Sequence, residues 1–142
     1  ILIRTDLEIA LLEQGLPVED LPAEWNRRYE QLLGIAPTTD AEGCLQDVHW
    51  SEGLFGYFPS YLLGHLISAQ LSEAMEAEIG TPEQHIATGD VSPMLAWLRQ
   101  NVHGVGRALN AEDLVQQVTG RPLDSTAFLR HLTAKLKALA TL

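Results

Sequence analysis

Apolar residues recur along most of the chain with the spacing of amphipathic helices. Between residues 1 and 14 they follow the i, i+3, i+4, i+7 pattern of one buried helix face. These residues are Ile1, Ile3, Leu7, Ala10, Leu11 and Leu12. Gly15 and Pro17 then form the stop that is typical beyond a helix C-terminus. Because the helical pattern is already running at Ile1, we expect the chain to be a piece of a longer protein.

The same signals predict a second helix over residues 21–33, with Asp20 as its N-cap, Pro22 in its first turn and Gly34 at its end. Its inward residues would be Trp25, Tyr29, Leu32 and Leu33. Further helices are predicted over about 60–79, 92–103, 110–120 and 125–139. No stretch shows the alternation of a strand. The sequence therefore predicts an all-α fold, with residues 1–142 as a single helical region without a linker.

Residues 35–59 break this pattern, because glycines and prolines are interleaved with aromatic side chains. Flexible linkers are poor in aromatic residues, since nothing in a linker offsets the entropy lost on ordering. We therefore expect a packed, irregular segment, and such segments often carry function. Trp50, Phe55 and Phe58 are most simply core or wall residues.

Composition narrows the possible partners. Nineteen acidic and nine basic residues give a formal charge of −10, which argues against a nucleic-acid partner. No apolar run reaches the roughly 20 residues needed to cross a bilayer, so we expect no membrane association. The single cysteine, Cys44, excludes an intramolecular disulfide and favours a cytoplasmic location.

Spacing alone offers little catalytic chemistry. Five histidines are present, but no two are four residues apart, so the H-E-x-x-H zinc motif is absent. Asp47 and His49 form a D-x-H pair, which is too few ligands for a closed metal site. Cys44 has no neighbouring histidine at helical spacing, and no serine lies in a nucleophile elbow. A stand-alone hydrolase that uses His49 and Asp47 stays open as a hypothesis.

The segment Gly43–Gly64 reads GCLQDVHWSEGLFGYFPSYLLG. It resembles the G-x-L-Q-D-x-H-W-S-x-G-x-F-G-Y-F-P-[TS]-Y-x-L-G signature of the thermostable carboxypeptidase 1 family, the Taq carboxypeptidase type. The flanks agree: Ile1–Glu8 is similar to the end of the family's L-H-I-x-x-R-[YFT]-[ED]-[LI]-E helix. Trp97–Arg107 and Val118–Gly120 are similar to its W-L-R-x-N-[IV]-H-x-x-G-R and [VA]-T-G stretches.

The resemblance implies a mostly helical metallopeptidase that removes C-terminal amino acids from peptides, usually as a homodimer. In the family zinc (or cobalt) is held by an H-E-x-x-H helix and a further Glu, which would precede Ile1. We therefore expect this chain to be the C-terminal part of the catalytic domain, with no metal ligand of its own and no activity alone. The missing N-terminal part would be its partner. The alternative is a catalytically silent helical module for packing or dimerisation.

Six residues in the matched motifs are candidates for the site. A carboxypeptidase must bind the substrate's terminal carboxylate and stabilise a tetrahedral oxyanion. The resemblance suggests His49 and Tyr57 as catalytic residues, Arg107, Tyr61 and Gln46 as substrate-binding residues, and Asp47 as the residue that orients His49. Four of them have a structural alternative: Tyr57 and Tyr61 could pack the start of the long helix, His49 could be a buried partner of Asp47, and Arg107 could complement a helix dipole.

Overall fold

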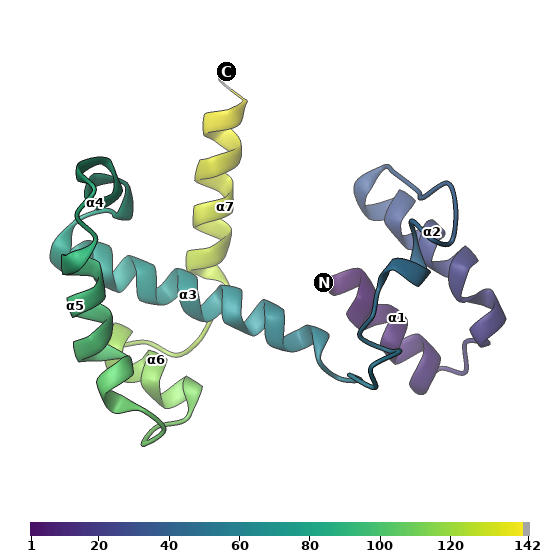
Figure 1. Cartoon of the computed structure of the whole chain (residues 1–142), viewed down its shortest axis with the longest axis horizontal. Coiled ribbons are helices and arrows are strands. Elements are labelled where there is room, and N and C mark those ends of the chain that lie inside the picture. The colour runs from purple at the N-terminus through teal and green to yellow at the C-terminus, as the bar shows by residue number, and fades with distance from the viewer. Residues whose placement is uncertain (141–142) are drawn as a thin grey trace. The chain divides into compact units, whose positions relative to one another are not determined.

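The computed structural model describes residues 1–140, and every regular element in this range is a helix (Figure 1). The α-helices are α1 (Leu2–Leu12), α2 (Leu21–Leu33), α3 (Phe58–Ile79), α4 (Pro82–Thr88), α5 (Ser92–Asn101), α6 (Ala111–Thr119) and α7 (Thr126–Leu139). Three 3-10 turns accompany them: η1 (Val18–Asp20), η2 (Cys44–Gln46) and η3 (His103–Val105). The all-α prediction is confirmed.

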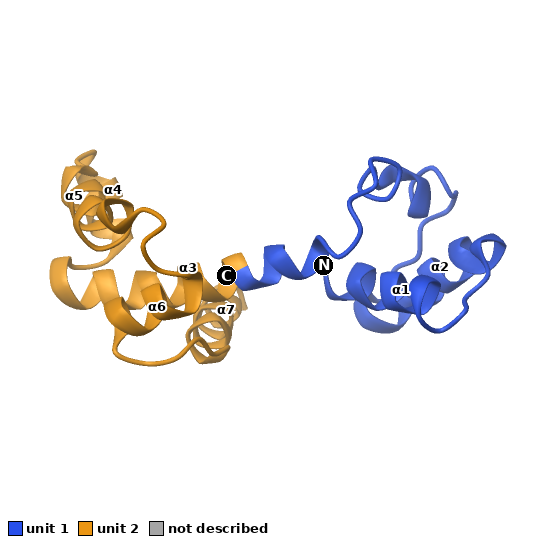
Figure 2. Cartoon of the chain, turned by 90° about the horizontal axis from the view of Figure 1, so that it is seen from below, with its two compact units in different colours: residues 1–63 blue, residues 64–142 orange. Residues whose placement is uncertain are grey.

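The chain folds as two compact units, Ile1–Leu63 and Gly64–Leu142, which Figure 2 colours separately. The boundary between them falls inside α3, so no linker separates the units. That residues 1–142 form one region of a catalytic domain stays a prediction. No helix within residues 1–140 is long and apolar enough to cross a membrane.

The core of the first unit forms where α1 and α2 pack around a tryptophan. Ile3 and Leu7 of α1 are buried with Trp25 of α2 and with Cys44. Tyr29 stacks on Trp25 with ring centroids 5.0 Å apart. Burial raises the pKa of the Cys44 thiol, because the charged thiolate is disfavoured away from water. This cysteine therefore belongs to the packing rather than to the chemistry.

A buried amide braces the second unit. Gln70 of α3 is fully buried, and its side chain donates from Nε2 to the carbonyl oxygen of Pro122 at 3.1 Å. Its Oε1 accepts the backbone N–H of Asp124 at 2.8 Å. The pair of bonds ties α3 to the turn that precedes α7. Asp124 in turn accepts the N–H of Thr126, and this hydrogen bond lowers the pKa of its carboxyl group.

Local signals placed most of the helices correctly, but they missed one helix and placed several exposed residues on buried faces. Leu32 and Leu33, expected to face inward, are exposed, and so are Ile1 and Leu12, expected on the buried face of the first helix. An apolar face in the sequence does not say what covers it. The helix α4 was not predicted. Its signal was a capping box, in which Thr81 accepts the N–H of Gln84 and the Gln84 side chain accepts the N–H of Thr81.

Replacing Gln70 by leucine tests whether its two buried hydrogen bonds stabilise the second unit. The substitution leaves the Pro122 carbonyl and the Asp124 N–H without their partner, which should lower the free energy of unfolding by about 1–3 kcal/mol. Urea unfolding measures this change. Gln100→Leu on the exposed face of α5 is the matched control and should change it by less than about 0.5 kcal/mol. Equal effects of the two substitutions would show that the hydrogen bonds of Gln70 do not stabilise the fold.

Candidate functional site

The helix α1 carries two charged residues one turn apart on the side that it turns to the core. Arg4 is partly buried, and Glu8 is buried beside Leu7. Charged groups are costly to remove from water unless they are paired or hydrogen-bonded. Both residues meet this condition with partners in the irregular segment that precedes α3.

Glu8 holds the middle and the end of that segment. One carboxylate oxygen accepts the indole N–H of Trp50 at 2.9 Å, and the other accepts the backbone N–H of Gly56. Gly56 has a φ of 71°, a left-handed conformation that glycine adopts without the strain of a side chain. The chain therefore turns at Gly56 and brings the next residue, Tyr57, to the start of α3.

Arg4 holds the middle of the segment through Asp47. Its Nη1 lies 2.7 Å from Oδ2 of Asp47, whose side chain is only 1% exposed. The guanidinium also lies over two rings, 5.4 Å from the centroid of Trp25 and 6.0 Å from that of Phe58. An ion pair so well covered has a fixed geometry, because neither partner can move into solvent without losing the other.

Asp47 in turn fixes His49. Oδ1 of Asp47 accepts the backbone N–H of His49 at 2.9 Å and lies 2.8 Å from its Nδ1. At the other side of the ring, Nε2 lies 3.0 Å from the hydroxyl oxygen of Tyr61. The imidazole is therefore bonded at both nitrogens.

Three aromatic rings surround this imidazole, and together with it they form what we call the His49 cluster. The ring centroids of Tyr57, Phe58 and Tyr61 lie 5.8, 4.8 and 5.8 Å from that of His49. Phe58 is buried, whereas Tyr57 and Tyr61 are 43% and 41% exposed. The two tyrosines meet edge to face, with centroids 5.2 Å apart. The cluster thus exposes two phenol groups beside a half-buried imidazole.

The structure brings four of the six candidate residues together: Asp47, His49, Tyr57 and Tyr61. Gln46 is exposed at the end of η2, and within residues 1–140 no hydrogen bond joins its side chain to His49. Arg107 is exposed and belongs to the second unit, so its role beside the cluster stays a prediction.

Arg4 and Glu8 are the residues of the site that sequence reasoning missed. Both lie in the stretch Ile1–Glu8, which is similar to the family's helix. A usable signal was present. Two charges four residues apart fall beside Ile3 and Leu7 on the apolar face, where a charge needs a buried partner.

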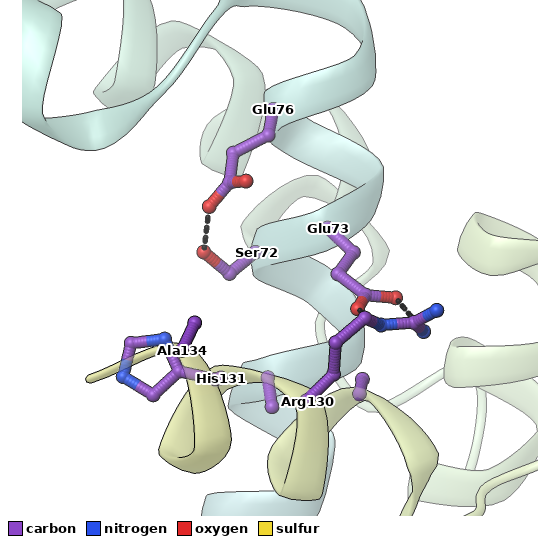
Figure 3. A pocket seen from close by; sticks show the side chains of 8 residues that line it. Ser72, Glu73, Glu76, Arg130, His131 and Ala134 are labelled. Carbon is purple, nitrogen blue, oxygen red and sulfur yellow. Dashed lines mark hydrogen bonds and ion pairs between the residues drawn. The ribbon is translucent and has the colours of Figure 1, made fainter. Parts of the chain in front are cut away.

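The second unit has a pocket of its own, between α3 and α7 (Figure 3). Glu73 accepts hydrogen bonds from Arg130 at 2.8 and 3.2 Å and from Arg121 at 2.6 Å. Ser72 donates to Glu76 at 3.1 Å. Because these polar groups are bonded to one another, the pocket offers a substrate less chemistry than the His49 cluster does.

Comparison with known proteins identifies the family. The profile of the carboxypeptidase Taq (M32) metallopeptidase family matches residues 1–136. The chain belongs to the M32 metallopeptidase family. This confirms the resemblance seen in the segment Gly43–Gly64.

Individual relatives agree with the M32 assignment. Thermostable carboxypeptidase 1 of Thermus thermophilus is 44% identical over 98% of the chain, and carboxypeptidase 1 of Bacillus subtilis is 40% identical over 98%. The crystal structure of the M32 carboxypeptidase from Deinococcus radiodurans R1 matches 99% of the chain with a TM-score of 0.89 and 37% identity. The chain spans only 27% and 28% of the two curated relatives and 28% of the crystallised protein.

A metallopeptidase family implies a divalent metal, and the described residues do not fit one. Within residues 1–140 no group of three or more His, Cys, Asp or Glu side chains is placed to hold a metal ion. Asp47 and His49, the D-x-H pair, bond to each other and to Arg4 and Tyr61. The described part of this M32 chain therefore supplies no set of metal ligands.

Replacing Asp47 should destabilise the loop that carries the His49 cluster. Asp47→Ala leaves Arg4 and His49 without their shared partner and should lower the free energy of unfolding by about 3 kcal/mol. Chemical denaturation measures the loss. Asp40→Ala, an exposed aspartate in the same segment, should cost less than about 0.5 kcal/mol. A loss at Asp47 no larger than at Asp40 would show that the ion pair does not hold the loop.

Proposed function

We propose that the whole protein containing this chain is a metal-dependent carboxypeptidase and that this chain supplies part of its peptide-facing surface. The observation that supports the proposal most is the His49 cluster, in which a fully bonded imidazole leaves two exposed phenol groups in defined positions. Hydrolysis of a peptide bond passes through a tetrahedral oxyanion, and preorganised donors that meet this charge accelerate the reaction.

The proposed roles follow from what each side chain can donate. Within residues 1–140 the hydroxyl of Tyr57 makes no hydrogen bond, so its proton is available to a developing oxyanion. His49, whose two ring nitrogens are engaged, would act through the Tyr61 hydroxyl that it holds. Arg107 suits the terminal carboxylate of the peptide, because its planar guanidinium can bind both oxygens. Gln46 and Tyr61 would contribute further contacts to the substrate.

We further propose that the metal, zinc or cobalt, is held by parts of the protein outside this chain. Two findings support this: the chain spans about a quarter of its relatives, and no ligand group is found within residues 1–140. Its partners would be peptides, the rest of the same protein and a second copy in a homodimer. A cytoplasmic location agrees with the single, buried cysteine.

One observation favours the alternative function, a silent packing or dimerisation module. The helix α7 exposes four leucines that are spaced along one stripe. They are Leu129, Leu132, Leu136 and Leu139. Exposed apolar patches mark surfaces that other protein segments cover. The two functions are compatible, and activity of the whole protein distinguishes an enzyme from a module.

The isolated 142-residue chain should release no amino acid from peptides with a free C-terminus, even with added zinc or cobalt, because no ligand set for the metal lies within residues 1–140. The whole protein should release C-terminal residues under the same conditions, and a chelator should stop it. Mass spectrometry of the peptide products measures both. Turnover by the isolated chain that is lost in His49→Ala would instead support the stand-alone hydrolase.

Arg107→Ala in the whole protein should weaken recognition of the peptide's terminal carboxylate. Loss of a charge-assisted hydrogen bond of about 1.5–3 kcal/mol corresponds to a rise in KM of about 10- to 150-fold. Steady-state kinetics on a peptide with a free C-terminus measure this change. Arg99→Ala, another exposed arginine, is the control and should leave KM within about twofold. An unchanged KM in Arg107→Ala would remove this residue from the substrate site.

A further inference from the structure

We propose that Arg4 is a positioning residue for the hydroxyl group of Tyr61 and that it acts through Asp47 and His49. The inference rests on the proposed function for its meaning in catalysis. Its physical part, the control of Tyr61 by Arg4, can be measured separately. Four side chains form one continuous chain of contacts, with distances of 2.7, 2.8 and 3.0 Å between successive partners.

The first step fixes the proton of His49. Asp47 pairs with the Arg4 cation and is therefore a carboxylate, which accepts hydrogen bonds and donates none. Because its Oδ1 faces Nδ1 of His49 at 2.8 Å, Nδ1 must carry the proton. In the neutral imidazole Nε2 is then an acceptor, so Tyr61 donates its hydroxyl proton to Nε2.

The second step concerns freedom of movement. The Asp47 side chain is 1% exposed and that of His49 is 18% exposed, so neither can turn toward solvent while its neighbours stay in place. Phe58 packs against the imidazole and also lies beneath the guanidinium of Arg4. Tyr61, by contrast, is 41% exposed. The end of the chain of contacts that can reach a ligand is therefore Tyr61, and His49 positions it.

The third step predicts what Tyr61 binds. With its proton directed at Nε2, the Tyr61 oxygen offers lone pairs to a ligand. It can accept an N–H from a bound peptide, and it is poorly suited to a carboxylate. Tyr57, whose hydroxyl makes no hydrogen bond within residues 1–140, can donate instead. The two neighbouring phenols thus have different partners: Tyr61 takes a peptide N–H and Tyr57 takes an oxygen.

A double-mutant cycle in the whole protein tests the proposal. Arg4→Met should lower kcat/KM by about 10- to 100-fold in the wild-type background, since a small displacement of a positioned group is that costly. In the Tyr61→Phe background the same substitution should lower kcat/KM by less than about twofold, because the hydroxyl it positions is gone. Its effect on the free energy of unfolding should be the same in both backgrounds.

Two further variants separate positioning from packing. Arg4→Lys keeps a cation for Asp47, with which Arg4 pairs through a single nitrogen, and should retain kcat/KM within about threefold. Arg28→Met breaks another partly buried ion pair in the same unit, the one to Glu24 at 2.7 Å, and should leave kcat/KM within about twofold. Additive losses in the cycle, or equal losses in Arg4→Lys and Arg4→Met, would overturn the proposal.

A readout without turnover distinguishes failure of this inference from failure of the proposed function. With ring-labelled tyrosine, the NMR signals of Tyr61 should shift in Arg4→Met and stay unchanged in Arg28→Met. If the wild-type whole protein releases no C-terminal residue, the carboxypeptidase proposal fails, and the NMR result still decides whether Arg4 controls Tyr61. Unchanged Tyr61 signals in Arg4→Met would overturn the inference.

Discussion

Arg4 and Glu8, one turn apart on the buried side of α1, hold the irregular segment that leads into α3. Arg4 pairs with Asp47 in the middle of the segment, and Glu8 accepts hydrogen bonds from Trp50 just beyond it and from Gly56 near the end. A segment rich in glycine and proline has no regular hydrogen-bonding pattern to order it. Its shape therefore comes from these side-chain contacts and from the aromatic residues packed around them.

This arrangement places the candidate site residues on a rigid support. A helix is stiffer than a loop, and side chains that are locked by packing and hydrogen bonds hold a site more accurately than loop residues alone. Here α1 fixes Asp47, Asp47 fixes His49, and the exposed phenols of Tyr57 and Tyr61 follow at the start of α3. The candidate site is thus built outward from the core, from the buried Asp47 carboxylate to the exposed rings of Tyr57 and Tyr61.

How far the sequence predicted the fold depended on how local the signals were. The helix α2 begins at Leu21 and ends at Leu33 as expected, because its proline and its terminal glycine lie within a few residues of its ends. The packing of the loop could not be predicted in this way. Glu8 meets Trp50 and Gly56 across 42 and 48 residues of sequence, and no local pattern encodes such a pairing.

The candidate site was predicted in the same uneven manner. The family motif identified His49, Tyr57 and Tyr61, which the structure brings together. It did not reveal that both nitrogens of His49 are engaged, since this depends on Arg4 and on the direction of the Tyr61 hydroxyl. The place of Arg107 stays a prediction, because it lies in the second unit.

The proposed function requires that this chain meets the peptide through the exposed phenols of the His49 cluster. A crystal structure of the whole protein with a non-hydrolysable peptide bound tests it most directly. The hydroxyl oxygens of Tyr57 and Tyr61 should lie within about 3.2 Å of polar atoms of the peptide, with a peptide N–H at Tyr61 and an oxygen at Tyr57. A peptide that binds without contact to either tyrosine would contradict it.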